Sequence, residues 1–196
     1  MAINPRILDS RIGHSFPGMI GPADIFYTPD EHTDRLGSRV LEAIGVQRIR
    51  RLKIFAHGVT VRDGGAVYLG AFIQVGQPGI RLDNTENTLG RLRGQFSESG
   101  ALVELFCCEM ANPVGGVYPG ADPADSVPAA IARTLQVPVR AAVDVQIFRT
   151  DEVRGWFSGT TDEDVRFDRW EGAVWLYTPD GGRYRDVIHD SLLDLR

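Results

Sequence analysis

The chain lacks a long apolar run. No stretch approaches the roughly 20 consecutive apolar residues that a membrane-spanning helix needs. The first residues, Met1 to Ile20, also lack the charged start and apolar core that are typical of a secretory signal. We therefore expect no membrane partner and a cytoplasmic protein, although secretion without a cleaved signal stays open.

Cysteine is scarce as well. The only two cysteines, Cys107 and Cys108, are adjacent, and neighbouring cysteines rarely form a stable disulfide because its geometry is strained. A disulfide framework is thereby excluded, and a reducing cytosol is the default compartment. Adjacent cysteines also lack the spacing of a zinc knuckle. We considered a metal held by Cys107, Cys108, His57 and Glu109, and we expect neither a metal nor another cofactor.

Positive charge is in deficit. The 21 lysines and arginines are outnumbered by 26 acidic residues, which gives a net charge of −5. A nucleic-acid partner normally needs a basic patch, so none is expected. The one basic run, residues 48–53, leads directly into an apolar segment and is best interpreted as a solvated strand start. The Gly-x-Ser-x-Gly motif of serine hydrolases and the Gly-rich loop that binds nucleotide phosphates are also missing.

What the chain does contain is an ordinary globular composition, with 196 residues of which 43% are apolar. That length supports one sizeable core, so we predict a single domain over 1–196. Within it, residues 1–22 are expected to form an irregular N-terminal arm, and 151–196 a C-terminal strand and helix extension that follows a loop-like segment over 151–168.

Apolar strands alternate with amphipathic helices along the rest of the chain. This order predicts an α/β fold, a three-layer α/β/α domain with a mainly parallel sheet covered on both faces. The expected strands are 23–27, 52–56, 66–73 (in a hairpin or at a sheet edge), 101–106, 139–145 and 170–178. The expected helices are 33–45, 84–100, 125–135 and 186–195.

Two of the predicted core strands end in reactive side chains. His57-Gly58 follows the run Leu52 to Ala56, and Cys107-Cys108 follows the run Ala101 to Phe106. Sites in a parallel sheet form at the carboxyl ends of the strands, and residues at two such ends can become neighbours. An imidazole has an ordinary pKa near 6.5 and suits the task of deprotonating a thiol. The sequence therefore predicts a cysteine–histidine dyad.

These motifs resemble the caspase-like cysteine peptidase superfamily. An apolar run ending in His-Gly, a Gly-rich hairpin ending in Leu69-Gly70, and a second apolar run ending in a small residue and Cys are similar to bacterial caspase-like domains of poorly known function. The resemblance covers roughly residues 23–146. It implies a hydrolase, a thiol protease with a polypeptide substrate and no cofactor.

By position, the resemblance implies that His57 is the general base and Cys108 the nucleophile, with Cys107 in the small-residue slot. Cys107 as the nucleophile stays open, because alternation from Leu105 does not decide between the two thiols. The N–H groups of Gly58 and Cys108 are candidate oxyanion donors. Met110-Ala111 replace the usual polar or Gly residues beyond the cysteine.

Other functions remain open. Asp144 and Trp156 are candidates for lining a substrate pocket, Asp144 by contacting a basic side chain. The alternative function is a catalytically inactive caspase-like interaction module that uses exposed aromatic residues such as Tyr118, Trp156 and Tyr184. A third hypothesis is an enzyme switched on by an activating partner or ligand, gated by the loop over 112–126.

Overall fold

The fold was analysed in a computed structural model of the chain. The structure describes residues 2–12, 23–62, 68–108, 110–111, 126–143, 149–154, 161–166, 170 and 172–186.

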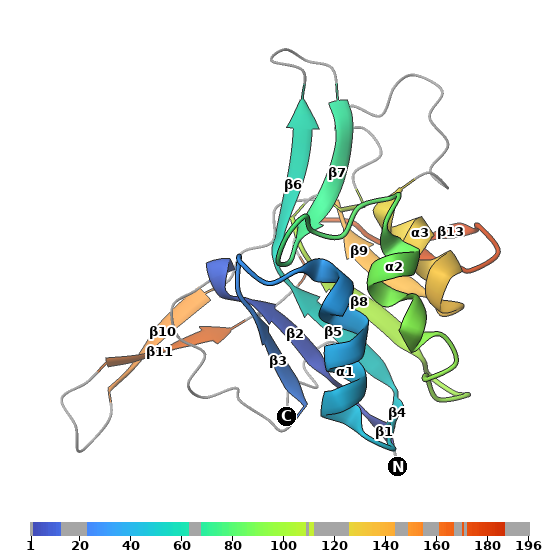
Figure 1. The fold of residues 1–196 in the computed structure, drawn as a ribbon. Coiled ribbons are helices and arrows are strands. Elements are labelled where there is room, and N and C mark those ends of the chain that lie inside the picture. Colours follow the sequence, from blue (N-terminus) through green and yellow to red (C-terminus); the bar gives the residue numbers. More distant parts are fainter. Residues whose placement is uncertain are drawn as a thin grey trace.

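A seven-stranded sheet forms the centre of the molecule, in the order β13-β12-β9-β8-β5-β2-β3 (Figure 1). The five strands from β9 to β3 run parallel, and β12 and β13 are antiparallel additions at one edge. The fold is therefore α/β with a mainly parallel sheet, as expected. The strand bounds are β2 Arg6–Asp9, β3 Asp24–Tyr27, β5 Arg51–Phe55, β8 Leu102–Phe106, β9 Val139–Ala142, β12 Val174–Tyr177 and β13 Arg183–Asp186.

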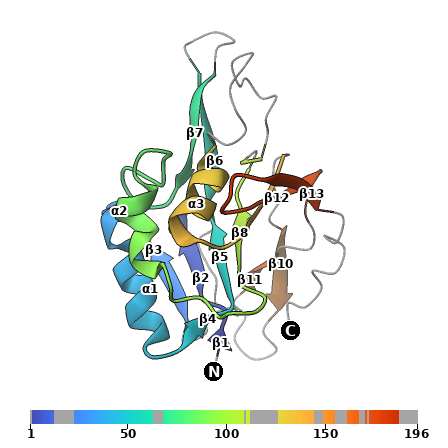
Figure 2. The same cartoon turned by 90° about the vertical axis from the view of Figure 1, so that its right-hand side faces the viewer.

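The three α-helices of the described residues pack on one face of this sheet, and α2 lies between α1 and α3 (Figures 1 and 2). Helix α1 (Leu36–Ile44) follows a 3-10 turn, η2 (Thr33–Arg35), and ends at Gly45, whose φ of 57° suits glycine. Helix α2 (Thr85–Leu89) continues into the 3-10 turn η3 (Gly90–Leu92) and is shorter than the expected helix over 84–100. No described helix could cross a membrane.

Helix α3 (Val127–Leu135) begins where its sequence predicts. The Ser126 hydroxyl accepts a hydrogen bond from the backbone N–H of Ala129, and Pro128 occupies the first turn. The second helical layer that a three-layer α/β/α arrangement requires does not occur among the described residues, whose helices all lie on the same face of the sheet.

The two faces of the sheet carry different side chains, as strand alternation requires. On β8, Val103 and Leu105 join the large core under the helices. Phe106 points to the opposite face and joins a smaller cluster with Phe55 and Trp170. The rings stack there, with centroids 4.5 Å apart for Phe55 and Phe106 and 4.6 Å apart for Phe106 and Trp170. We call these the helix face and the aromatic face.

A row of charged residues also crosses the aromatic face. The register places Arg6 beside Lys53, Lys53 beside Glu104, and Glu104 beside Arg140. Arg140 donates to Glu104 at 2.9 Å and to Asp186 at 2.6 Å. Glu104 is fully buried, and this face therefore contains ion pairs where the helix face has aliphatic side chains.

The expectation of an irregular arm over 1–22 is wrong for residues 2–12. Strand β1 (Ala2–Ile3) pairs with β4 (Arg48–Ile49), and β2 lies inside the sheet between β3 and β5. Ile7 and Leu8 on β2 are fully buried, one on each face. Only these two consecutive apolar residues mark the strand, which is too little for a pattern to show. A 3-10 turn, η1 (Ser10–Ile12), follows it.

The C-terminal expectation needs a second correction. The segment over 151–168, predicted to be loop-like, contains an antiparallel hairpin of β10 (Arg149–Arg154) and β11 (Thr161–Arg166). Their polar sequences carry no apolar alternation, so no local pattern indicates strands there. The strand expected over 170–178 is present as β12. Asp186, the predicted start of a helix, belongs to β13, and the rest of that helix lies outside the described residues.

Candidate functional site

The carboxyl ends of β5 and β8 bring the two predicted reactive residues to the same level of the sheet. The strands pair in parallel, with Phe55 beside Phe106 as the last register pair. His57 and Cys108 each follow two residues later. Beyond β5 the chain turns into β6 (His57–Arg62), which pairs with β7 (Tyr68–Gln74) as the predicted hairpin and rises beyond the sheet (Figure 1). His57 therefore begins a strand rather than ending one.

The His57 ring is exposed and has one defined polar neighbour. Its Nε2 lies 3.3 Å from the backbone carbonyl oxygen of Arg11. A carbonyl oxygen can only accept a hydrogen bond, so Nε2 is the donor in this contact. In the neutral ring Nδ1 is then the unprotonated nitrogen, and it is the atom able to receive a proton.

The two cysteines have opposite environments, and neither forms a disulfide. Cys107 is fully buried in the core of the helix face, and its thiol lies 3.7 Å from the carbonyl oxygen of Ile54. Burial raises the pKa of the Cys107 thiol far above its ordinary value, and the neighbouring Cys108 adds to the effect. Cys108 is partly exposed. Of the two cysteines, Cys108 is the more exposed.

Gly58 fits tightly against the backbone of Cys108. A Cβ atom at position 58 would lie 1.9 Å from the carbonyl oxygen of Cys108, closer than any side chain could tolerate. Position 58 therefore requires glycine, because the β6 backbone passes directly against the backbone of Cys108 there. The oxyanion role of the Gly58 and Cys108 N–H groups stays a prediction.

The short segment after the cysteines is fastened from two sides. The N–H of Ala111 donates to the carbonyl oxygen of Ala142 at 2.8 Å, and Arg183 donates to the carbonyl oxygen of Ala111 at 2.9 Å. The guanidinium of Arg183 also lies over the Trp175 ring, 3.9 Å from its centroid. Met110 and Ala111 are buried, which explains why apolar residues occur there.

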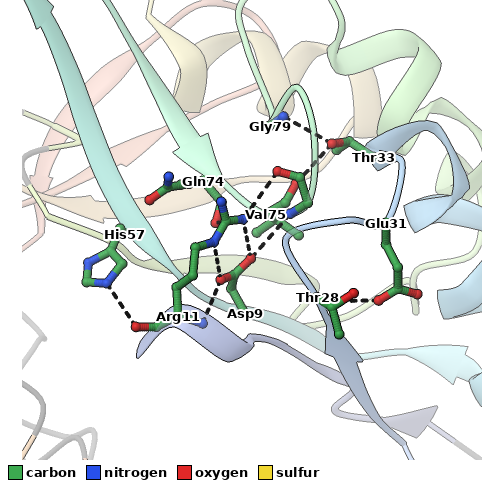
Figure 3. A network of polar contacts seen from close by, with 10 residues as sticks. Asp9, Arg11, Thr28, Glu31, Thr33, His57, Gln74, Val75 and Gly79 are labelled. Atoms are coloured by element: carbon green, nitrogen blue, oxygen red, sulfur yellow. Dashed lines mark hydrogen bonds and ion pairs between the residues drawn. The ribbon is translucent and has the colours of Figure 1, made fainter. Parts of the chain in front are cut away.

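Sequence reasoning missed Asp9 and Arg11, which form the polar network nearest to His57 (Figure 3). Asp9 ends β2 and is fully buried, and Arg11 lies in η1. The only sign in the sequence is an acidic residue that ends a short apolar run and is followed by an arginine two positions later. Apart from each other, Asp9 and Arg11 contact His57, Gln74 and Gly76, which lie 46 or more positions away in the chain, so no local pattern could assign these contacts.

Several predicted residues lie outside the described residues. They include both candidates for the substrate pocket, the residue after the dyad cysteine and most of the loop proposed as a gate: Asp144, Trp156, Glu109, Tyr118 and residues 112–125. Tyr184, named for the alternative interaction role, lies on β13 and is 59% exposed.

Within the parts of the chain that the structure describes, no three His, Cys, Asp or Glu side chains gather as a metal site. Comparison with protein-family models found none that matches this chain, and comparison with curated proteins found no similar sequence.

Proposed function

We propose that the protein is a cysteine endopeptidase of caspase-like fold, in which Cys108 is the nucleophile and His57 the general base. One observation carries the proposal: His57 and Cys108 follow the last register pair of two adjacent parallel strands, at equal distance along the chain. A histidine and a thiol at one sheet edge are the minimum equipment for nucleophilic catalysis at neutral pH.

The environments of the two thiols support Cys108 over Cys107. A nucleophilic thiol must be accessible and must ionise, and Cys107 is buried where its ionised form is disfavoured. The contact of His57 Nε2 with the Arg11 carbonyl leaves Nδ1 as the proton acceptor. His57 is thus equipped to take the proton of a thiol that comes within hydrogen-bond reach.

In the proposed reaction, the Cys108 thiol gives its proton to His57 and the sulfur attacks the carbonyl carbon of the scissile peptide bond. The C–N bond then breaks as the His57 imidazolium protonates the leaving amine. Water, deprotonated by His57, hydrolyses the thioester and releases the acid and the free thiol. The N–H groups of Gly58 and Cys108 are the proposed donors to the oxyanion. The substrate is a polypeptide.

The fold part of the proposal is a caspase-like α/β domain. Its support is the parallel strand order, the His-Gly step at the start of a hairpin, and the capped helix α3 between β8 and β9. A reducing, cytoplasmic location belongs to the same proposal, because the proposed nucleophile is a thiol.

The test is cleavage of a peptide library by the purified protein. The Cys108→Ala and His57→Ala variants should each lose at least roughly 10³-fold of the activity, as removal of a nucleophile or its base does in enzymes of this kind. Cys107→Ala is the matched control, because it removes the neighbouring thiol and should retain cleavage. Activity that survives Cys108→Ala but disappears in Cys107→Ala would reverse the assignment of the nucleophile.

Failure of the folded wild-type protein to cleave any peptide would contradict the enzyme proposal and favour the interaction module. The library reaction is then repeated with added cell extract, which could supply an activating partner. Cleavage that appears only with the extract and is lost in Cys108→Ala would identify an enzyme that needs such a partner.

A further inference from the structure

Among the described residues, the His57 ring has one polar contact that can orient it. The distance of 3.3 Å between His57 Nε2 and the carbonyl oxygen of Arg11 is longer than that of a typical N–H···O hydrogen bond. The orientation of an exposed imidazole with one such contact depends on how firmly the accepting carbonyl group is held. The position of the Arg11 backbone therefore decides where the base is directed.

A buried carboxylate fixes that part of the backbone. Asp9 accepts from the Arg11 backbone N–H at 2.9 Å, from Arg11 Nε at 2.7 Å and from Arg11 Nη2 at 2.7 Å. The N–H of Gly76 adds a fourth donor at 3.2 Å. The side chain of Asp9 is fully buried, so these donors compensate its loss of water and lock η1 against the end of β2.

The same arginine also fixes the strand beside His57. Arg11 Nη2 donates to the carbonyl oxygens of Gln74 and Gly76, both at 3.2 Å. Gln74 is the register partner of His57 in the β6–β7 hairpin. Gly76 has a φ of +60°, and a Cβ atom there would lie 2.4 Å from the carbonyl oxygen of Glu31. The turn that receives Arg11 is thus closely packed and cannot shift freely.

We propose that Asp9 and Arg11, here called the Asp9–Arg11 clamp, are positioning residues that hold His57 in the Nε2–H tautomer with Nδ1 open to the thiol proton of Cys108. The clamp rests on the proposed function, because it serves the base of that reaction. The transfer moves one proton from Sγ to Nδ1 and leaves a thiolate beside an imidazolium whose Nε2–H is held by the Arg11 carbonyl. No electron transfer or co-reactant is involved.

The test measures alkylation of Cys108 by iodoacetamide against pH, in a Cys107→Ala background that leaves one thiol. A thiol without a base is only a few per cent ionised at pH 7, so pairing with His57 raises the alkylation rate roughly 10- to 30-fold there. Arg11→Lys keeps the charge but loses the planar fork of donors, and it should remove most of this enhancement. Asp9→Asn should act in the same direction.

The matched control is the ion pair at the other end of β2, where Arg6 binds Asp24 through two hydrogen bonds. Arg6→Lys disturbs a comparable fork on the same strand, far from His57, and should leave the pH profile of alkylation unchanged. Circular dichroism confirms folding of each variant. Should Asp9→Asn fail to fold, Arg11→Lys, whose side chain is 22% exposed, carries the test.

A second readout separates the two proposals. Nitrogen-15 NMR of labelled histidine, assigned with His57→Ala, should show the Nε2–H tautomer in the wild type and a mixture of tautomers in Arg11→Lys. A folded Arg11→Lys with the wild-type tautomer and wild-type alkylation would overturn the clamp. If His57→Ala leaves alkylation unchanged while Arg11→Lys still alters the tautomer, the dyad fails and the clamp's hold on His57 stands.

Discussion

The helix face and the aromatic face of the sheet are stabilised by different kinds of side chain. Under the helices, aliphatic side chains interlock and Cys107 is one more small apolar residue. The aromatic face combines three stacked rings with the ion pair of Glu104 and Arg140. The two adjacent cysteines show the same contrast. Cys107 is buried, whereas its neighbour Cys108 is partly exposed. The strands under the helices thus contribute mainly aliphatic packing, whereas the aromatic face adds the ion pair of Glu104 and Arg140 to its apolar cluster.

The largest difference between the two faces should be in the reactivity of the Cys107 and Cys108 thiols. A disulfide reagent should modify Cys108 in the native protein, while Cys107 reacts only after local or global opening and hence more slowly by roughly 10²-fold or more. Mass spectrometry of Cys107→Ala and Cys108→Ala, each labelled with and without urea, measures both rates. Equal rates in the native state would remove the contrast between the faces at this point.

Removal of Arg140 should be the most costly change on the aromatic face. Arg140→Met removes the hydrogen-bonded cation of the buried Glu104 carboxylate and leaves Lys53 as its charged neighbour on the adjacent strand, which should cost up to about 3–5 kcal/mol of the free energy of unfolding. Adding Glu104→Leu should restore most of the loss, since an apolar pair fits a site already bordered by Phe106. Urea unfolding measures both. If the double variant is no more stable than Arg140→Met, the cost does not come from the stranded carboxylate.

On the helix face the corresponding loss comes from packing alone. Leu105 is fully buried under the helices, and Leu105→Ala should cost roughly 2–5 kcal/mol through lost transfer energy and an unfilled cavity. Leu105→Met conserves volume and should cost less than about 1.5 kcal/mol. A loss in Leu105→Ala that matches that of Leu105→Met would mean that this core repacks without a cavity.

The buried lysine of the aromatic face predicts a smaller, pH-dependent effect. Burial lowers the pKa of Lys53, although Glu104 opposes this shift. Since the unfolded chain then binds the proton more tightly, stability should increase as the pH rises from the lowered pKa towards the ordinary value of about 10.4. The stability of Lys53→Met should lack this increase. Urea unfolding at a series of pH values tests it, and parallel curves for the two proteins would contradict it.

Tyr27 on the helix face predicts a loss of stability with rising pH, the opposite of the effect of Lys53, and at a higher pH. Burial, with a contribution from Glu31, raises the pKa of Tyr27 to about 12, and its hydroxyl donates to the carbonyl oxygen of His32 at 2.7 Å. The stability that this shift provides is complete below about pH 10, the ordinary pKa, and is lost as the pH rises to about 12. The advantage of the wild type over Tyr27→Phe should therefore shrink in that range, as measured by urea unfolding.

The parts of the fold that the sequence predicted are those with a strong local pattern. The runs before His57 and Cys107 are continuous and apolar, so β5 and β8 were predictable, and their parallel pairing aligned the two residues. Helix α3 was equally clear, because Ser126 and Pro128 mark its start. Strand β2 was missed because Ile7 and Leu8 alone do not make a recognisable run, although they lie at the centre of the sheet.

The remaining features of the site depend on contacts between distant segments. The sequence did not decide between the two thiols, because their difference comes from packing against the helix face. Nor could it predict that the Arg11 carbonyl meets His57, 46 positions along the chain. The Gly58 requirement has a local signal, a glycine after the histidine, but its cause is the Cys108 backbone.

The position of Arg183 has a practical consequence for watching this site. Its guanidinium rests on the Trp175 indole while one of its N–H groups holds the carbonyl of Ala111, three residues beyond Cys108. A displacement of the segment that contains Ala111 should move the Arg183 guanidinium, which contacts the Trp175 ring. We therefore expect the fluorescence of Trp175, in a protein whose other two tryptophans are replaced, to change when the segment after Cys108 moves.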